Sequence, residues 1–364
     1  MTHGSQLDRE VLSHFLLGFE GTSLSAAFSN LLARGLGGVA IYPRNFDSPV
    51  ALRKLIDEIR AAACGPVLIG IDQEGGTKFS LPEPFTQWPS PAQLGAIGDA
   101  ALVQRVAESM ARELRAVGVN LNFAPMLDLH VHAESPVTRG RSFGSQPDVV
   151  AKLGVACIEG LWKRGGVLAC AKHFPGHGDA QVDPHEDLPV IRGDAERLAT
   201  AELVPFDAAI AAGVPLIMTA HIVVMKIDAV RPATLSSPIV TTLLRERMGF
   251  QGVIVADDLG MGAIRKQFPH QPPAALALRA GADLLMLCHD WNLVEPALES
   301  VQLGLRQGWY SELAWQASLA RLEKIRESLS RMSTAFSQES LDCIGGREHR
   351  ELAAQVLARA AQQH

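Results

Sequence analysis

Eight short apolar runs recur along the chain, and each is followed by a polar or glycine-containing turn and an amphipathic stretch. Helix-like segments such as residues 48–63 and 99–118 lie between them. Apolar strands that alternate with helices are typical of a parallel sheet buried on both faces. Eight such units predict an α/β fold, a (β/α)8 barrel of TIM type. The runs are residues 14–21, 37–45, 66–73, 119–129, 166–174, 215–222, 252–259 and 283–290.

An open, doubly wound sheet is the alternative, because apolar runs alone do not show that a sheet closes. Neither GxGxxG nor GxxxxGK[ST] follows a predicted strand, which disfavours a nucleotide-binding domain. In seven of the eight runs the charged or histidine residues fall at the C-terminal end, and in a barrel those ends meet on the face that forms the active site. These residues are Arg44, Asp72, Asp128, Lys172, His173, His221, Asp257, Asp258, His289 and Asp290.

One catalytic domain is expected over residues 1–332, with barrel-closing helices in 291–332. Residues 333–364 are predicted to form a C-terminal helical extension, in which Gly345–Gly346 precedes an alanine-rich helix. The extension is too short to form a second domain. A chain of 364 residues with 47% apolar residues can bury a large core within the barrel alone.

Charge and hydropathy exclude several classes of partner. The net charge is −6 and no stripe dense in lysine and arginine occurs, which argues against nucleic acid. No stretch approaches the roughly 20 apolar residues of a membrane span, and the N-terminus shows no secretory pattern. Four of the five scattered cysteines (Cys64, Cys157, Cys170 and Cys288) have apolar neighbours, so buried thiols in a reducing compartment are expected. We therefore expect a cytoplasmic protein.

Asp257 and Asp258 end the seventh run, in VIVADDLGM. Adjacent residues of a strand point to opposite sides, so one carboxylate is expected to face the substrate while the scaffold holds the other. The roles open to the first are nucleophile, general base or metal ligand. The alternative is an N-cap pair that starts the next helix.

Asp183 and His185 belong to a polar loop after the fifth run, KHFPGHGDAQVDPHEDLPV. A carboxylate two residues away can fix the tautomer of a histidine and raise its basicity. The loop is long enough to fold over the barrel mouth, as functional lids do. Taken alone, such a pair is more often simply solvated.

Asp72, Arg141, Lys172 and His173 form the third candidate group. Cations beside carboxylates can hydrogen-bond the hydroxyl groups of a sugar from several directions. A structural ion-pair network would use the same residue types and is the alternative.

A metal site is a further alternative. His130 and His132 follow the fourth run, and Lys172, His173, His221 and Asp257 could complete a set like that of the amidohydrolases. In amidohydrolases the His-x-His pair lies on the first strand, which counts against this interpretation.

With these residues in place, the sequence resembles glycoside hydrolase family 3, and specifically its single-domain bacterial β-N-acetylglucosaminidases. The resemblance extends from about residue 37 to residue 290 and rests on motifs in the expected order. The most specific are KHFPGHGD with its downstream DxH and the later DDLGM. The motifs are GGVAIYPRNF, IDQEGG, LNFAPMLDL, RSFG, KHFPGHGDAQVDPH, MTAHI, PATLSS and GFQGVIVADDLGM.

The resemblance implies a role for each matching position. Asp257 is the expected nucleophile, and Asp183 with His185 the expected acid–base dyad. Sugar binding is expected at Asp72, Arg141, Lys172 and His173. These roles imply a retaining double displacement, with no metal or cofactor.

The expected function is exo-acting release of terminal N-acetylglucosamine by a monomer or weak homo-oligomer, with peptidoglycan fragments as the expected substrates. Within the family the alternatives are a β-glucosidase, a β-xylosidase or a phosphorylase, and outside it a non-catalytic sugar-binding barrel. The chain departs from the family pattern at Thr77 and Ser80, where arginines are common, and at Ser135, Thr138 and Arg139. The departures leave open which sugar and aglycone are bound.

Overall fold

Eight parallel strands form a closed barrel in the order β1-β10-β9-β7-β5-β4-β3-β2. The computed structural model describes residues 3–178, 188–191, 195–268, 272–335 and 339–363. Each barrel strand lies within one predicted run, so the (β/α)8 prediction is confirmed and the open-sheet alternative is wrong. The strands are β1 (Phe15–Leu17), β2 (Gly38–Ile41), β3 (Leu68–Ile71), β4 (Leu121–Asn122), β5 (Leu168–Phe174), β7 (Leu216–Thr219), β9 (Val253–Ala256) and β10 (Leu284–Leu287).

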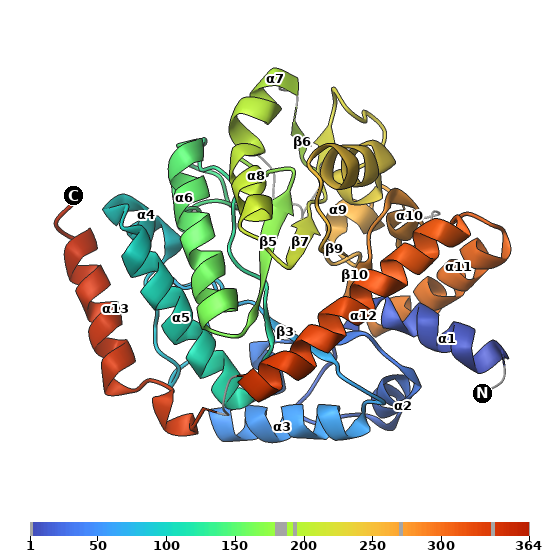
Figure 1. Cartoon of the computed structure of the whole chain (residues 1–364), viewed down its shortest axis with the longest axis horizontal. Coiled ribbons are helices and arrows are strands. Elements are labelled where there is room, and N and C mark those ends of the chain that lie inside the picture. The colour runs from blue at the N-terminus through green and yellow to red at the C-terminus, as the bar shows by residue number, and fades with distance from the viewer. Residues whose placement is uncertain (1–2, 179–187, 192–194, 269–271, 336–338, 364) are drawn as a thin grey trace.

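Helices surround the barrel (Figure 1). They are α1 (His3–Ser13), α2 (Ala26–Arg34), α3 (Pro49–Ala62), α4 (Pro91–Ile97), α5 (Ala100–Val117), α6 (Pro147–Ile158), α7 (Ala195–Arg197), α8 (Val204–Ala211), α9 (Gly262–Arg265), α10 (Pro273–Ala280), α11 (Val294–Arg306), α12 (Glu312–Ala335) and α13 (Arg347–Ala360). Wider helical turns span Glu159–Arg164, Leu198–Glu202 and Pro238–Arg247, and tighter turns span Pro43–Asn45, Ala233–Leu235, Trp291–Leu293 and Leu341–Cys343. Two short strands outside the barrel, β6 (Val190–Ile191) and β8 (Val223–Val224), pair in parallel.

Side-chain caps begin the two helices that the sequence indicated most clearly. The Ser48 side chain accepts a hydrogen bond from the Ala51 amide at the start of α3. Asp99 accepts from the Leu102 amide at the start of α5. Such caps satisfy amides that have no partner within the helix, so both predicted helices begin where a capping residue precedes an apolar face.

Apolar side chains fill the barrel interior where the strands begin. Leu16, Leu68, Leu168, Leu216 and Leu284 are all buried there, and Leu322, Ile325 and Leu329 of α12 pack against the same cluster. Figure 1 shows α12 as the long helix that crosses beneath the strands. The barrel is therefore closed at this end, which leaves the opposite end for a site.

Helix α13 packs against α4 and α5 at the edge of the molecule (Figure 1). The buried Glu113 carboxylate of α5 joins it to the barrel. Glu113 Oε1 lies 2.8 Å from His349 Nδ1 and accepts from the Gly345 amide at 3.0 Å. Thr86 Oγ1 donates to the same oxygen at 2.5 Å. A buried carboxylate with this many donors fixes the position of α13.

The cysteines differ in exposure. Cys170 and Cys288 are buried, Cys157 and Cys343 are partly buried, and Cys64 is exposed. The expectation of a buried thiol is wrong for Cys64, which lies in the turn after α3. Across the described ranges, no helix combines the length and apolar character needed to cross a bilayer.

Candidate active site

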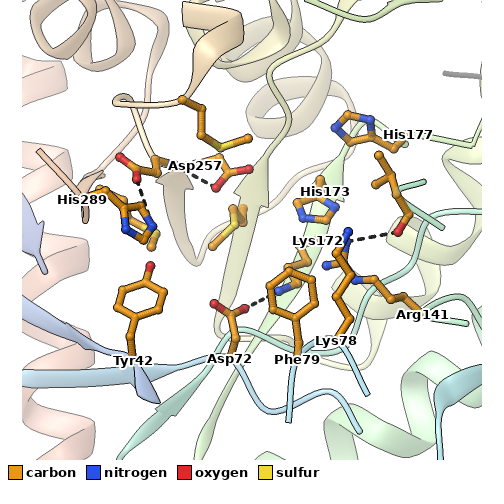
Figure 2. Close-up of a pocket in the computed structure, with 15 residues that line it drawn as sticks. Tyr42, Asp72, Lys78, Phe79, Arg141, Lys172, His173, His177, Asp257 and His289 are labelled. Carbon is orange, nitrogen blue, oxygen red and sulfur yellow. Dashed lines mark hydrogen bonds and ion pairs between the residues drawn. The ribbon is translucent and has the colours of Figure 1, made fainter. Parts of the chain in front are cut away.

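Polar side chains that follow the carboxyl ends of the strands meet in one pocket (Figure 2). The pocket encloses about 720 Å³ and is partly open to solvent. It lies at the end of the barrel opposite α12, where barrel enzymes place their chemistry. Its walls are Tyr42, Asp72, Lys78, Phe79, Val137, Arg141, Lys172, His173, His177, Met218, Asp257, Asp258, Met261, Met286 and His289.

The turn after β3 places the Asp72 carboxylate and the Phe79 ring at this pocket. The Glu74 amide donates to the Phe79 carbonyl at 2.8 Å, which closes the turn. Gly75 and Gly76 both have positive φ angles, and a Cβ on Gly75 would lie 2.4 Å from the Pro89 carbonyl oxygen. Both positions therefore require glycine, which explains the two glycines of IDQEGG.

Four charged side chains form a buried cluster on one wall, which we call the Lys172 cluster: Asp72, Glu74, Arg141 and Lys172. Lys172 Nζ lies 2.6 Å from Asp72 Oδ1 and 2.7 Å from Glu74 Oε1. Arg141 donates from Nη2 and Nε to the two oxygens of Glu74, at 2.7 and 2.8 Å. The guanidinium also lies 4.3 Å from the centre of the Phe79 ring. Glu74 thus holds both cations in place.

The members of the Lys172 cluster keep one another charged. Burial alone would raise the pKa of Glu74, but Arg141 and Lys172 outweigh it and hold that pKa well below its usual range. Burial likewise opposes the charge of Lys172, yet Asp72 and Glu74 raise its pKa. The Asp72 side chain retains 20% exposure at the pocket wall. The cluster therefore presents fixed charges to whatever enters the pocket.

Asp128 orients the histidine beside Lys172. His173 Nδ1 lies 2.7 Å from Asp128 Oδ2, and the His177 amide donates to Asp128 Oδ1 at 2.6 Å. Burial opposes the charge of Asp128, but His173 and the hydrogen bonds lower its pKa. A carboxylate behind one ring nitrogen fixes the orientation of the imidazole. Asp128 therefore links His173 to the start of the loop that contains His177.

Asp257 follows β9, and its carboxylate lines the pocket. Its Oδ1 accepts from the Asp258 amide at 2.8 Å. Burial would raise the pKa of Asp257, but His221, His173, Lys172 and that hydrogen bond together lower it. Figure 2 shows Asp257 on the wall that faces Asp72. The carboxylates of Asp72 and Asp257 thus both line the pocket.

Asp258 is held by the scaffold, as the alternation of strand residues predicted. Its Oδ1 accepts from the amides of Gly260 at 2.9 Å and Cys288 at 3.3 Å. Burial is the main cause of the raised pKa of Asp258. The alternative of an N-cap pair is wrong, because α9 begins at Gly262 and its N-cap residue is Met261.

Of the residues in the metal alternative, His221 and His130 are held by protein groups and His132 lies outside the pocket walls. His221 is buried, with Nδ1 2.9 Å from Thr234 Oγ1 and Nε2 2.9 Å from the Asp258 carbonyl oxygen. His130 Nδ1 lies 2.9 Å from Thr138 Oγ1, and His132 lies outside the pocket walls. In the parts of the chain that the structure describes, no three His, Cys, Asp or Glu side chains are grouped to bind a metal ion.

Comparison with known proteins identifies the family. The sequence profile of the glycosyl hydrolase family 3 N-terminal domain matches residues 14–325. The chain belongs to glycosyl hydrolase family 3. It is 39% identical over 295 residues to a beta-hexosaminidase of Alkalilimnicola ehrlichii, covering 79% of this chain and 84% of that one. The family makes the chain a glycoside hydrolase.

Solved structures of family 3 enzymes have the same fold. A β-N-acetylglucosaminidase from Paenibacillus sp. str. FPU-7 aligns with a TM-score of 0.91 and 36% identity, over 97% of this chain and 68% of that one. NagZ from Neisseria gonorrhoeae, solved in complex with N-trifluoroacetyl-D-glucosamine, aligns with a TM-score of 0.78 and 30% identity. That alignment covers 95% of this chain and 98% of NagZ.

Five of the seven site residues predicted from the sequence line the same pocket of this family 3 barrel: Asp72, Arg141, Lys172, His173 and Asp257. The other two, Asp183 and His185, lie outside the described residues. The sequence did not predict a place at this site for Tyr42, Glu74 or Phe79. Glu74 had a usable signal, because it lies two residues beyond Asp72 and directly before two glycines.

Proposed function

We propose that the protein is an exo-acting, retaining β-N-acetylglucosaminidase that releases terminal N-acetylglucosamine from glycosides such as peptidoglycan fragments. The support from similarity is that the Alkalilimnicola relative is named a beta-hexosaminidase and the Paenibacillus structure a β-N-acetylglucosaminidase. We further propose that it acts in the cytoplasm, as a monomer or weak homo-oligomer. The single observation that supports the chemistry best is the ionised Asp257 on the wall facing the Lys172 cluster.

Asp257 is the proposed nucleophile. One of its oxygens bonds to the anomeric carbon while the bond from that carbon to the leaving oxygen breaks. His185 gives its proton to the leaving oxygen, and Asp183 stabilises the charged imidazole. Water then attacks the anomeric carbon, passes a proton to His185 and frees Asp257. The lowered pKa of Asp257 supports this role, because a nucleophilic carboxylate must be ionised at neutral pH.

The proposed sugar-binding residues are Asp72, Arg141, Lys172 and His173. Asp72 can accept hydroxyl protons, while Lys172 and Arg141 can donate to hydroxyl oxygens. Contacts with Glu74 hold Arg141 and Lys172, and a contact with Asp128 holds His173, before substrate arrives. Such preorganisation reduces the cost of binding. The ion pairs that order the Lys172 cluster leave its pocket side available. The cluster can therefore stabilise the fold and bind a sugar at the same time.

The first experiment is a panel of p-nitrophenyl β-glycosides of N-acetylglucosamine, glucose and xylose at one pH. A kcat/KM highest for the N-acetylglucosaminide supports the proposal, and a preference for glucoside or xyloside contradicts it. The same assay with inorganic phosphate tests for a phosphorylase, whose turnover would depend on phosphate. The assay with EDTA tests for a metal hydrolase, which would lose activity.

A second experiment tests the proposed acid–base role of His185. His185→Ala should lose most turnover on a methyl glycoside, whose leaving alcohol needs a proton. It should lose much less on a dinitrophenyl glycoside, whose leaving group departs unprotonated. Asp183→Asn should show the same pattern with a smaller loss. Equal losses on the two substrates would contradict the acid role.

A further inference from the structure

A second hollow adjoins the pocket at the ends of β1 and β10. It encloses about 620 Å³, and His289 lines both spaces. Because its walls follow the carboxyl ends of two barrel strands, it opens on the same face of the barrel as the pocket. The two spaces are therefore neighbouring parts of one surface. We call this second space the Trp291 hollow; its walls include Phe19, Glu20, Phe28, His289, Asp290 and Trp291.

Trp291 provides an aromatic surface in this hollow. It is 43% exposed, whereas Trp88 and Trp315 are 2% and 5% exposed. The Phe28 ring lies 5.7 Å from the indole, and Phe19 lies 4.9 Å from Phe28. Both phenylalanines are buried. An indole supported from behind by packed rings is held in place while one part stays open to a ligand.

Carboxylates border the aromatic surface. Asp290 accepts from the Asn292 amide at 3.1 Å and pairs with Arg265 at 3.2 Å. Glu20 pairs with Arg44 at 2.9 Å, while its own side chain remains 73% exposed. A flat apolar surface with carboxylates at its edge suits a pyranose ring, which has an apolar face and a rim of hydroxyl donors.

His289 lines both spaces and forms the partition between them, and Arg44 holds it in place. Arg44 donates to the Cys288 carbonyl at 2.6 Å and lies 4.4 Å from the centre of the Tyr42 ring. Arg44 Nη1 lies 3.3 Å from His289 Nδ1, which must accept because a guanidinium only donates. The partition is therefore ordered, and its His289 side chain is still 57% exposed.

The direction of a bound glycoside points to this partition. Figure 2 shows Tyr42 and His289 on the side of the pocket opposite Lys172 and Arg141. In a β-glycoside the bond to the leaving group is equatorial and prolongs the long axis of the sugar ring. A ring held at its far edge by the Lys172 cluster therefore directs its leaving group toward His289 and the space beyond it.

We propose that the Trp291 hollow binds the leaving-group sugar, with one face of its pyranose ring stacked on the indole and its hydroxyls directed to Glu20 and Asp290. This inference rests on the proposed function, because it takes the Lys172 cluster as the grip on the terminal sugar. The hollow then favours substrates in which a second sugar follows the bond that is cleaved.

The test compares two substrates that both release an aliphatic alcohol. One is the β-1,4-linked disaccharide of N-acetylglucosamine, and the other is methyl β-N-acetylglucosaminide. Trp291→Ala should lower kcat/KM for the disaccharide by about tenfold, and leave the methyl glycoside within about twofold of wild type. Trp291→Phe should recover much of the loss, because it restores an aromatic face. Leu303→Ala is the matched control, since Leu303 is 41% exposed and does not line the hollow.

The melting temperature of each variant shows whether the fold is intact. An equal loss on both substrates, or no loss on either, would overturn the proposal for the hollow. Failure of the proposed function looks different, because the wild-type enzyme would then cleave neither N-acetylglucosaminide. Fluorescence of Trp291 gives a second readout. Free N-acetylglucosamine should quench the wild-type emission more than that of Trp291→Phe, and equal quenching would count against stacking.

Discussion

Asp257 and Asp283 are aspartates at opposite ends of the same barrel, and their surroundings differ: Asp257 is partly exposed at the pocket, whereas Asp283 is fully buried. Asp283, just before β10, is 0% exposed and all of its partners are protein groups. Its Oδ2 accepts from Arg245 at 2.8 Å and from the Ile254 amide at 2.9 Å. Its Oδ1 accepts from Ser318 at 2.7 Å and from Arg321 at 2.9 Å. Asp257 faces the pocket and, from the residues that the structure describes, accepts one hydrogen bond, from the Asp258 amide.

The difference separates a structural carboxylate from the proposed nucleophile. An ionised carboxylate offers about four acceptor positions. Protein donors occupy the acceptor positions of Asp283, so this carboxylate can only stabilise the fold. Against the effect of burial, His221, His173, the Asp258 amide and Lys172 lower the pKa of Asp257, and within the described part of the chain one amide is its hydrogen-bond donor. The two residues therefore differ both in exposure and in the number of described protein donors around them.

The largest expected effect follows from Asp257→Asn. The substitution preserves shape but removes the proposed nucleophile, so kcat/KM should fall by at least about 10⁴-fold. The melting temperature should stay within a few degrees of wild type or rise, because a partly buried charge is removed. Kinetics with a p-nitrophenyl glycoside and thermal unfolding measure the two quantities.

Asp258→Asn is the matched control for Asp257→Asn. Its Oδ1 can still accept from Gly260 and Cys288, so kcat/KM should remain within about tenfold of wild type. A 10⁴-fold loss in this variant, with little loss in Asp257→Asn, would reverse the assignment of the two residues.

Lys172→Met should have the next largest effect on activity. It removes hydrogen bonds to Asp72 and Glu74 and a donor at the pocket wall, so kcat/KM should fall about a hundredfold. The melting temperature should fall only modestly, because Arg141 still neutralises Glu74. The loss of kcat/KM in Lys172→Met is thus expected to be smaller than in Asp257→Asn and larger than in an Asp283 variant. A large loss of stability with normal kcat/KM would place it with Asp283 instead.

Asp283→Ala should affect stability and not catalysis. It leaves Arg245 and Arg321 without their shared carboxylate, which costs about 3–5 kcal/mol for a broken buried pair. Urea unfolding measures that loss. The kcat/KM per folded molecule should equal that of wild type, and a selective loss of kcat/KM would break the comparison. Asp283→Asn, which keeps the acceptor oxygen, should lose less stability than the alanine variant.

The repeating strands predicted the barrel well because each buried strand must be a continuous apolar run whatever its neighbours are. Strand ends also located Asp72, Lys172 and Asp257, since in a barrel those ends meet. Glu74 and Phe79 were harder to predict. Their placement depends on a turn closed by two glycines and by a contact with Pro89, which is distant in sequence. The structural role of Asp283 was likewise invisible, because its partners come from separate helices and strands.

The smallest expected effect is on the pH dependence of the unfolding free energy. It involves one histidine at each end of the barrel. Burial lowers the pKa of His14, beside Asp283, and of His177, at the pocket, to about 4. Each histidine is therefore neutral in the folded protein at pH 5, while the unfolded chain takes up a proton below about pH 6.5. The stability due to each is complete above pH 6.5 and is lost as the pH falls toward 4.

His14→Gln should remove one of these two contributions. Its amide can still donate to the Asp283 carbonyl, which lies 2.7 Å from His14 Nδ1. Between pH 7 and pH 5 the wild type should lose about 2 kcal/mol more unfolding free energy than the variant, because about 1.5 pH units of that range lie below the pKa of an unfolded histidine. Urea unfolding at the two pH values measures this difference. The pH profile of kcat/KM should not change, because His14 lies at the closed end, and a shifted profile would show that the two ends are coupled.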